Sequence, residues 1–533
     1  MSFLEDIKNV QSAKLTENGA YATSTTGSYL VDIFGLAGAF RTRQPEELVD
    51  LFNKAMAEDK LLATKFAYYL RDIREGLGER DAGKVLLYSL AVDYPKTFAA
   101  NIETMTEVGR YDDLVDILYG LKKSGIENEA THGLEDTLKS QYQKDMDGVS
   151  KGEPISLLGK WMPSINASSK ETKEKACMMR DLLGVDNMTY RKSLSSLREH
   201  LNVVERNISS KNYGEINYEA VPSRAMKQYK NAFERNDTEH FHNYLDAVRS
   251  GEQKINAGTL FPYDIVREFM TDRGTEAMDL AWKALPNYVD ENKNYLIMAD
   301  VSGSMSGLPM YTSVGLALYF AERNKGTFGN HFMTFSSNPE LVEVKGDTLE
   351  EKINYISNAD WGMNTDLEKA FDLILDTAVR NNTPVEDFPT SIVVISDMEI
   401  DYASRTDRLF SDTMKEKFAN AGYEMPNLVY WNVDARENTF HAKANDANIQ
   451  LVSGSSPTVF KTLCTGEFLT PLQNVEQTLN SPRYEKVVFV PNHARAIDKE
   501  VSKKAVDKLE EIKNEAKNSE KIEDKIYERE TSR

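Results

Sequence analysis

Apolar residues recur every three or four positions along the first half of the chain, the spacing of amphipathic helices. In residues 60–75 one such stripe is formed by Leu62, Phe66, Leu70 and Ile73. Residues 86–118 predict three short helices, broken at Asp93-Tyr94-Pro95 and at Gly109, because proline is tolerated in the first turn of a helix and glycine favours its end. No strand is predicted before about residue 285, so this half is expected to be helical.

From Asn294 onward the pattern changes to short, wholly apolar runs separated by helical stretches. Six runs are predicted as strands: 295–299, 331–335, 341–344, 391–396, 428–433 and 449–453. Thr348 and Glu351 form a capping-box signature before one of the intervening helices. Alternating buried strands and helices are typical of a parallel sheet covered on both faces, so we predict a doubly wound α/β domain. Ligands of such domains bind outside the carboxyl ends of the strands.

With 533 residues, the chain exceeds the size of one core, so several domains are expected. Successive short helices with tight turns favour a HEAT-like array, open or closed into a ring. We predict an N-terminal segment over 1–28, a helical HEAT-like domain over 29–288, an α/β domain over 291–485, and a charged helical or disordered tail over 496–533.

Composition indicates a soluble protein of a reducing compartment. Hydrophobic residues make up 41% and charged residues 28%, and no apolar run approaches the length of a membrane span. The first ten residues lack the features of a signal peptide. Only Cys177 and Cys464 are present, which excludes a zinc site built on several cysteines. We expect a cytoplasmic protein that does not contact membranes.

The net charge of −20 disfavours indiscriminate binding to nucleic acid, and no DNA partner is predicted. Residues 151–250 are less acidic, with 16 Lys and Arg against 13 Asp and Glu, a local net charge of +3. Any contact with phosphates is therefore expected in this block.

Small hydroxyls and carboxylates follow two of the predicted strands. Asp300, Ser302 and Ser304 come directly after 295–299, and Asp397 ends the run SIVVISD. Thr365 begins a further helix and adds a third hydroxyl. These five oxygen-bearing side chains suit Mg²⁺ or Mn²⁺, which prefer octahedral oxygen coordination. The alternative is a capped turn in which the serines satisfy backbone groups and no metal binds.

The D-x-S-x-S motif with a distant Thr and Asp resembles the metal-ion-dependent adhesion site (MIDAS) of von Willebrand factor A domains, over about residues 291–470. The resemblance implies that Ser302, Ser304 and Thr365 bind Mg²⁺, Mn²⁺ or Ca²⁺ directly or through water. It also implies that Asp300 and Asp397 act through waters, and that the carboxylate of a partner completes the coordination.

The order of the two parts resembles the Ro ribonucleoprotein architecture, in which a HEAT-like TROVE module precedes a von Willebrand factor A domain. Stretches such as RDIREGLGERDAG and GRYDDLVDIL look more like uncharacterised bacterial and phage proteins with the same two parts. The likeness covers the chain up to about residue 490. It implies binding of small structured RNA.

Cations of the least acidic block are the candidate RNA contacts. One predicted helix places Arg191, Lys192 and Arg198 opposite its apolar stripe. A second positive stripe consists of Arg224, Lys227 and Lys230. Lys160 adds a cation beside Trp161. Such side chains can contact the RNA backbone, with aromatic rings stacking on bases. The alternative is a solvated helix face whose cations pair with nearby Glu.

The leading hypothesis is therefore a cytoplasmic RNA-binding scaffold of a small ribonucleoprotein, with a metal site for an acidic ligand. The second is a metal-dependent protein interaction module that binds no nucleic acid. A third is an accessory subunit of a chelatase-like machine. Because no nucleophile or general base is evident, we do not predict an enzyme.

Overall fold

The computed structural model describes residues 11–41, 43–290, 293–334, 338–357, 366–401, 408–460 and 469–492. The chain divides into two compact units. The sheet unit contains the described residues within Met1–Arg43, Arg74–Leu77 and Asn217–Leu479, and the helical unit those within Gln44–Ile73, Gly78–Ile216 and Asn480–Arg533. Some helices of the predicted domain 29–288 therefore group with the sheet, and the predicted boundaries stay predictions. The predicted tail 496–533 lies outside the described residues.

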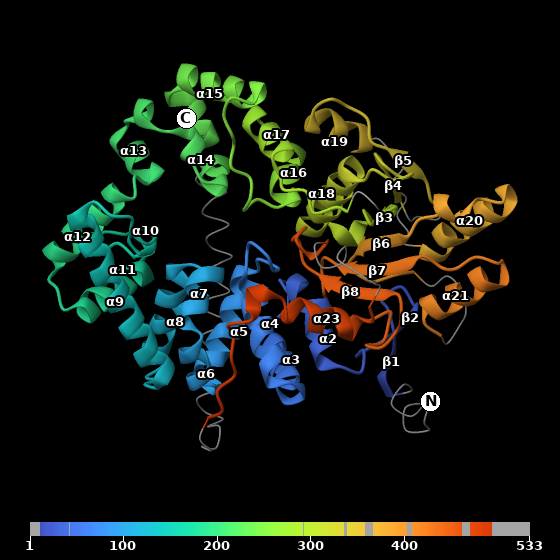
Figure 1. Ribbon diagram of the computed structural model, residues 1–533, viewed down its shortest axis with the longest axis horizontal. Coiled ribbons are helices and arrows are strands. Elements are labelled where there is room, and N and C mark those ends of the chain that lie inside the picture. Colours follow the sequence, from blue (N-terminus) through green and yellow to red (C-terminus); the bar gives the residue numbers. More distant parts are fainter. Residues whose placement is uncertain are drawn as a thin grey trace. The chain divides into compact units, whose positions relative to one another are not determined.

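The helical unit consists of successive helices, most of which pack on helices close to them in sequence (Figure 1). Their bounds are α3 Pro45–Glu58, α4 Lys60–Arg71, α5 Arg80–Asp93, α6 Pro95–Ala100, α7 Ile102–Val108, α8 Tyr111–Lys123, α9 Glu129–Lys151, α10 Leu158–Trp161, α11 Lys170–Leu183, α12 Asn187–His200 and α13 Val204–Ser210. Helix α5 packs against α3, α4, α6, α8 and α9, so it lies at the centre of this arrangement.

The helix boundaries follow local chemistry. Pro95 occupies the first turn of α6 and Gly109 follows α7, so both predicted breaks are confirmed. An additional break falls at Asn101, whose side-chain amide donates to the carbonyls of Thr97 and Val488, each at 2.7 Å. Sequence spacing missed this break because an asparagine that bonds to backbone carbonyls leaves no change in the apolar pattern.

Six strands form a single sheet in the order β5-β4-β3-β6-β7-β8. Their bounds are β3 Tyr295–Ala299, β4 His331–Thr334, β5 Leu341–Glu343, β6 Ser391–Ser396, β7 Asn427–Asn432 and β8 Ile449–Ser453. Every residue of β3, β6 and β8 is buried, as expected for strands covered on both faces. The order reverses between β3 and β6, which makes the crevice at their carboxyl ends a topological switch point.

Two sequence predictions about strands were wrong. The sheet is mixed rather than parallel, because β5 pairs antiparallel with β4. Only residues 335–340 separate these two strands, which is too short for the crossover that a parallel pair requires. The first half of the chain also contains a hairpin, β1 Ala13–Leu15 and β2 Tyr21–Thr23, whose three-residue strands are too short to produce a recognisable periodicity.

The helices of the sheet unit come from before, between and after its strands in sequence. They are α2 Tyr29–Leu36, α14 Ser223–Asn236, α15 Thr238–Ser250, α16 Pro262–Met270, α17 Glu276–Lys283, α18 Leu308–Arg323, α19 Leu349–Ser357, α20 Leu367–Asn381, α21 Phe410–Asn420 and α23 Pro471–Leu479. Helix α18 packs against β3 and β4, whereas α2 packs against β7 and β8. The predicted capping box is present before α19, since Thr348 and Glu351 exchange side-chain to backbone bonds.

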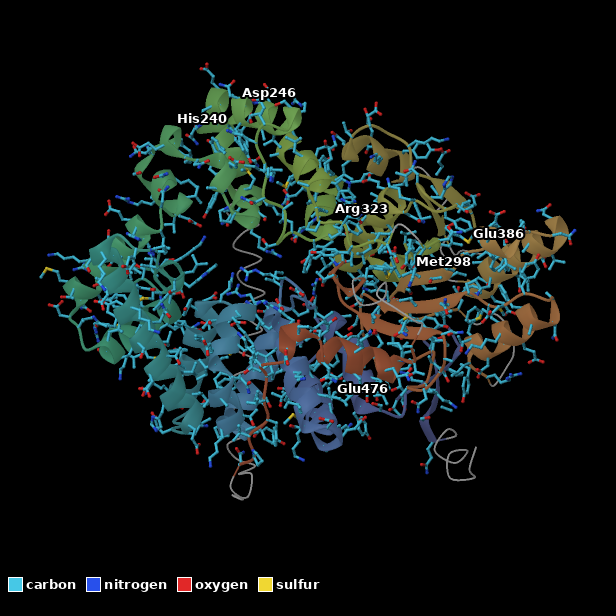
Figure 2. The ribbon with its side chains drawn as sticks, viewed as in Figure 1. His240, Asp246, Met298, Arg323, Glu386 and Glu476 are labelled. Atoms are coloured by element: carbon cyan, nitrogen blue, oxygen red, sulfur yellow. The ribbon has the colours of Figure 1, made fainter. Side chains whose placement is uncertain are left out.

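Figure 2 labels Met298 of β3, which is fully buried, and Arg323, which lies in the last turn of α18. The Arg323 guanidinium carbon lies 4.1 Å from the centre of the Tyr319 ring in the same helix. Within the described part of the chain, no helix has both the length and the apolar composition that crossing a membrane would require.

Candidate metal centre

The Asp300 carboxylate lies at the carboxyl end of β3. The backbone N–H of Asp300 donates to the carbonyl of Ile395 at 2.9 Å, which extends the pairing of β3 with β6 by one residue. One carboxylate oxygen accepts the N–H of Ser302 at 2.9 Å, a bond that aspartate commonly makes two residues along the chain. The Ser302 and Ser304 hydroxyl oxygens lie 2.9 Å apart. This loop therefore gathers one carboxylate and two hydroxyls.

The Asp397 carboxylate follows β6, the neighbour of β3 in the sheet. The Ser396 hydroxyl oxygen lies 2.7 Å from Asp300 Oδ2 and 3.4 Å from Asp397 Oδ1. The Ser396 hydroxyl can donate its one proton to only one of these carboxylates, and the shorter distance favours Asp300. Met398 then adopts a φ of 66°, a left-handed conformation that is uncommon for residues other than glycine.

Negative charge at this edge of the sheet is only partly balanced. Asp300 and Asp397 are 3% and 2% exposed. Burial, followed by the negative charge of Asp397, raises the pKa of the Asp300 carboxyl to about 6. Among the described residues, no Lys, Arg or His forms an ion pair with Asp300. A cation near this carboxylate would therefore relieve an unfavourable buried charge.

One guanidinium reaches the same place from the end of β7. Arg436 Nη2 donates to Asp397 Oδ2 at 2.5 Å and to the carbonyl oxygen of Ser304 at 2.9 Å. Because one nitrogen bonds both, the Ser304 loop and Asp397 lie next to each other. The structure therefore brings together four of the five predicted metal-binding residues: Asp300, Ser302, Ser304 and Asp397. The fifth, Thr365, lies outside the described residues.

The donor set fits a hard divalent cation. Two carboxylates and two hydroxyls are oxygen ligands of the kind that Mg²⁺, Mn²⁺ and Ca²⁺ take, with water completing the coordination. The burial of Asp300 beside Asp397, with no ion pair to Asp300 among the described residues, favours a cation here. No group of three or more His, Cys, Asp or Glu side chains is arranged to hold a metal within the described ranges. The candidate centre therefore depends on hydroxyls beside a carboxylate pair.

The candidate RNA contacts of the helical unit differ in how far their side chains are engaged by other groups of the protein. Arg191 and Lys192 are exposed on α12, as expected. Arg198 instead donates to the backbone carbonyls of Gly159 and Met162, at 3.1 and 2.8 Å. Lys160 lies 5.5 Å from the centre of the Trp161 ring and 4.0 Å from a carboxylate oxygen of Glu205.

The three cations of α14 face acidic residues of α16. Arg224 and Lys227 lie 3.3 and 3.2 Å from the Asp264 carboxylate, and Lys230 lies 2.6 Å from that of Glu268. The Lys230 side chain is only 5% exposed. Lys230 is therefore not part of a surface stripe and could contact RNA only by breaking a buried ion pair.

Sequence reasoning missed three residues of the candidate centre: Ser396, Arg436 and Glu17. Ser396 directly precedes Asp397 and could have been noticed in the same motif. Arg436 follows β7 by four residues, so the rule that parallel strands present their carboxyl ends at one edge could have found it. No sequence signal would have brought Glu17, whose carboxylate lies 3.3 Å from Arg436 Nη1, to this place.

Comparison with protein families matches almost the whole chain to two families of unestablished role. Residues 16–144 and 168–295 match DUF2828, and residues 294–516 match DUF7788, each described as a domain of unknown function. The change from one match to the other falls at the start of β3.

One relative and one solved structure resemble the chain over most of its length. An uncharacterized protein of Acanthamoeba polyphaga mimivirus is 28% identical over 513 residues, which cover 89% of this chain and 88% of the relative. The crystal structure of the RO (RSR) protein of Deinococcus radiodurans is 15% identical and aligns over 89% of this chain and 96% of that chain, with a TM-score of 0.34. At that score the likeness carries no argument about fold or function.

Proposed function

We propose that the sheet unit is a von Willebrand factor A-like domain whose carboxyl edge binds a divalent cation and, through it, a carboxylate of a protein partner. The single observation that carries this proposal is the placement of the buried Asp300 and Asp397 carboxylates around one hydroxyl, that of Ser396, at the switch point between β3 and β6. The neighbouring hydroxyls of Ser302 and Ser304 support it.

In this proposal each residue has a defined task. Ser302 and Ser304 offer hydroxyl oxygens to Mg²⁺, or to Mn²⁺ or Ca²⁺, and Thr365 would add a third. Asp300 and Asp397 supply the negative charge that holds the cation and accept hydrogen bonds from its waters. The bound cation supplies an electrophilic position for an anionic ligand. We propose binding rather than catalysis, because in this arrangement the hydroxyls and carboxylates hold the cation and its waters.

Affinity capture tests the proposal. The wild-type protein and a Ser302→Ala/Ser304→Ala variant serve as baits, and each is washed with buffer, with EDTA or with nuclease. A partner bound through the metal should be retained by the wild type, survive nuclease, and be released by EDTA. Retention of the same partner by the variant, or after EDTA, would contradict a metal-dependent contact.

A second candidate function, RNA binding by the helical unit as a HEAT-like scaffold, is favoured by the surroundings of Trp161. This ring is half-buried, and the guanidinium carbon of Arg110 lies 4.0 Å from its centre. Helix α10, which carries Trp161 and Lys160, packs against α12, which carries the exposed Arg191 and Lys192. A ring beside several cations can stack on a base while the cations contact phosphates.

Fluorescence anisotropy with a structured small RNA tests this second candidate. Binding should weaken as salt rises, because phosphate contacts release counterions. Trp161→Ala and Lys192→Gln should each weaken binding, whereas Arg380→Gln, which removes an exposed cation of the sheet unit, should not. Absence of binding at low salt would end the RNA proposal and leave the metal proposal standing.

A further inference from the structure

Arg436 lies beside more carboxylates than its single positive charge can neutralise. Besides Asp397 and the Ser304 carbonyl, its guanidinium lies 3.3 Å from Asp434 Oδ2 and 3.3 Å from Glu17 Oε2. The Asp397 side chain is 1% exposed and the Glu17 side chain 55%. The guanidinium therefore bridges a buried carboxylate of the candidate centre and a solvent-facing one.

The position of Glu17 is fixed by the turn of the β1–β2 hairpin. The Thr16 hydroxyl donates to the carbonyl of Ile400 at 2.8 Å, and the Asn18 side-chain amide donates to the carbonyl of Glu399 at 2.7 Å. The backbone N–H of Glu17 donates to the Glu399 carboxylate at 2.6 Å. Three bonds from successive residues thus hold this turn against the segment that follows Asp397, although nearly 400 positions separate the two in sequence.

The guanidinium uses the oxygen of Asp397 that other protein groups leave available. Asp397 Oδ1 already accepts the N–H of Glu399 at 3.1 Å and lies near the Ser396 hydroxyl, whereas Oδ2 faces Arg436. A divalent cation held through Asp397 would meet this positive charge at close range. Two cations near one carboxylate repel each other, so Arg436 and the metal oppose each other at this residue.

We propose that Arg436 is a resident cation that balances Asp397 in the metal-free protein and lowers the affinity of the site for divalent cations, and that Glu17 counteracts it by drawing the guanidinium toward the hairpin. This inference rests on the proposed metal site and deepens it, because it assigns the residues that set the metal affinity. Arg436 and Glu17 are positioning residues: neither is proposed as a metal ligand.

The two residues should have opposite effects on metal affinity. Arg436→Gln removes the competing charge and should tighten Mn²⁺ binding by about tenfold or more, since a unit charge a few ångströms away changes binding by at least that order in a partly buried site. Arg436→Lys keeps the charge and should bind within about threefold of the wild type. Glu17→Gln leaves the guanidinium on Asp397 and should weaken binding by roughly threefold.

Calorimetric titration of Mn²⁺ into the full-length chain measures these affinities. The neighbouring pair Lys14 and Glu437, joined at 2.5 Å, provides matched controls of the same charge change. Lys14→Gln and Glu437→Gln should have little effect, because neither side chain contacts Asp397. When Arg436→Gln is already present, adding Glu17→Gln should change the Mn²⁺ affinity no more than adding Glu437→Gln does. The guanidinium through which Glu17 acts is then gone.

The outcomes separate the inference from the proposed function. No Mn²⁺ binding by the wild type would overturn the metal site and this inference together. Wild-type binding with an unchanged or weaker affinity in folded Arg436→Gln would overturn the inference alone. If Arg436→Gln does not fold, the exposed Glu17→Gln decides: weaker binding than in Glu437→Gln supports the inference, and equal binding overturns it.

Discussion

Replacing Asp300 by asparagine removes one negative charge from the buried pair and keeps the shape of the side chain. The amide oxygen can still accept the N–H of Ser302, and the amide N–H₂ can donate to the Ser396 hydroxyl, which is then free to donate to Asp397. The substitution therefore changes charge with little loss of hydrogen bonding. We expect it to stabilise the metal-free protein at alkaline pH.

The magnitude follows from the pKa of Asp300. Burial and the charge of Asp397 raise this pKa from the ordinary value of 3.8 to about 6. Above pH 6 the carboxylate is ionised in both the folded and unfolded states, and keeping it ionised in the fold costs about 3 kcal/mol. As pH falls from about 6 to 4, the folded protein takes up the proton first, so this cost disappears. The asparagine side chain never carries the charge, so the advantage of Asp300→Asn, about 3 kcal/mol at pH 8, should vanish near pH 4.

Denaturant unfolding in EDTA at pH 8 and at pH 4 measures this effect. Asp366→Asn is a matched control, because Asp366 caps α20 by accepting the N–H of Lys369 and asparagine caps helices equally well. A gain for Asp300→Asn at pH 8 only, with no gain in the control, is the expected result. Equal effects at the two pH values, or a loss of stability at pH 8, would refute the reasoning that Asp300 is a buried charge lacking its cation.

Three further predictions concern the fold. Gly38→Ala should lower the melting temperature of the sheet unit, at a cost of about 1–3 kcal/mol, because the added Cβ would lie 2.6 Å from a backbone carbonyl oxygen at the end of β8. Gly258→Ala is the control: its Cβ would have no atom within 4 Å, so the melting temperature should not fall. Lys230→Met should lower the free energy of unfolding by at most about 3 kcal/mol, because the buried Glu268 carboxylate keeps only its longer contact with Lys227, at 3.8 Å. Adding Glu268→Leu should restore most of this loss in denaturant titrations. Burial lowers the pKa of His441 to about 4, so between pH 6.5 and 4 the unfolded chain binds a proton that the fold does not. His441 therefore lowers wild-type stability as pH falls over this interval and opposes the gain from protonating Asp300, so a His441→Gln variant should show a more favourable change in the same titration.

Continuous apolar runs allowed three strands of the sheet to be predicted residue by residue. Segments 295–299, 391–396 and 449–453 correspond to β3, β6 and β8, because strands buried on both faces read as nearly continuous apolar runs. The direction of β5 depends on a short connection, and the hairpin β1–β2 is held by contacts with distant residues. Neither leaves a signal in local periodicity.

The candidate site was only partly predictable for the same reason. Asp300 and Asp397 each follow a buried strand, and the rule that parallel strands end at one edge brings them together. Glu17 reaches the same edge through the hairpin turn, which no rule of spacing connects to residues near 400. The cations of α14 show the converse: helical spacing places them on one side, but only the packing of α16 reveals that Asp264 and Glu268 neutralise them.

Calorimetric titration of Mn²⁺ into metal-free wild-type protein and into Asp300→Asn at pH 8 is the most direct test of the metal site. Because the variant is expected to be at least as stable as the wild type, loss of binding cannot be attributed to unfolding. The account predicts saturable binding to a single site in the wild type and none in the variant. Equal binding by both proteins, or no binding by the wild type, would contradict it.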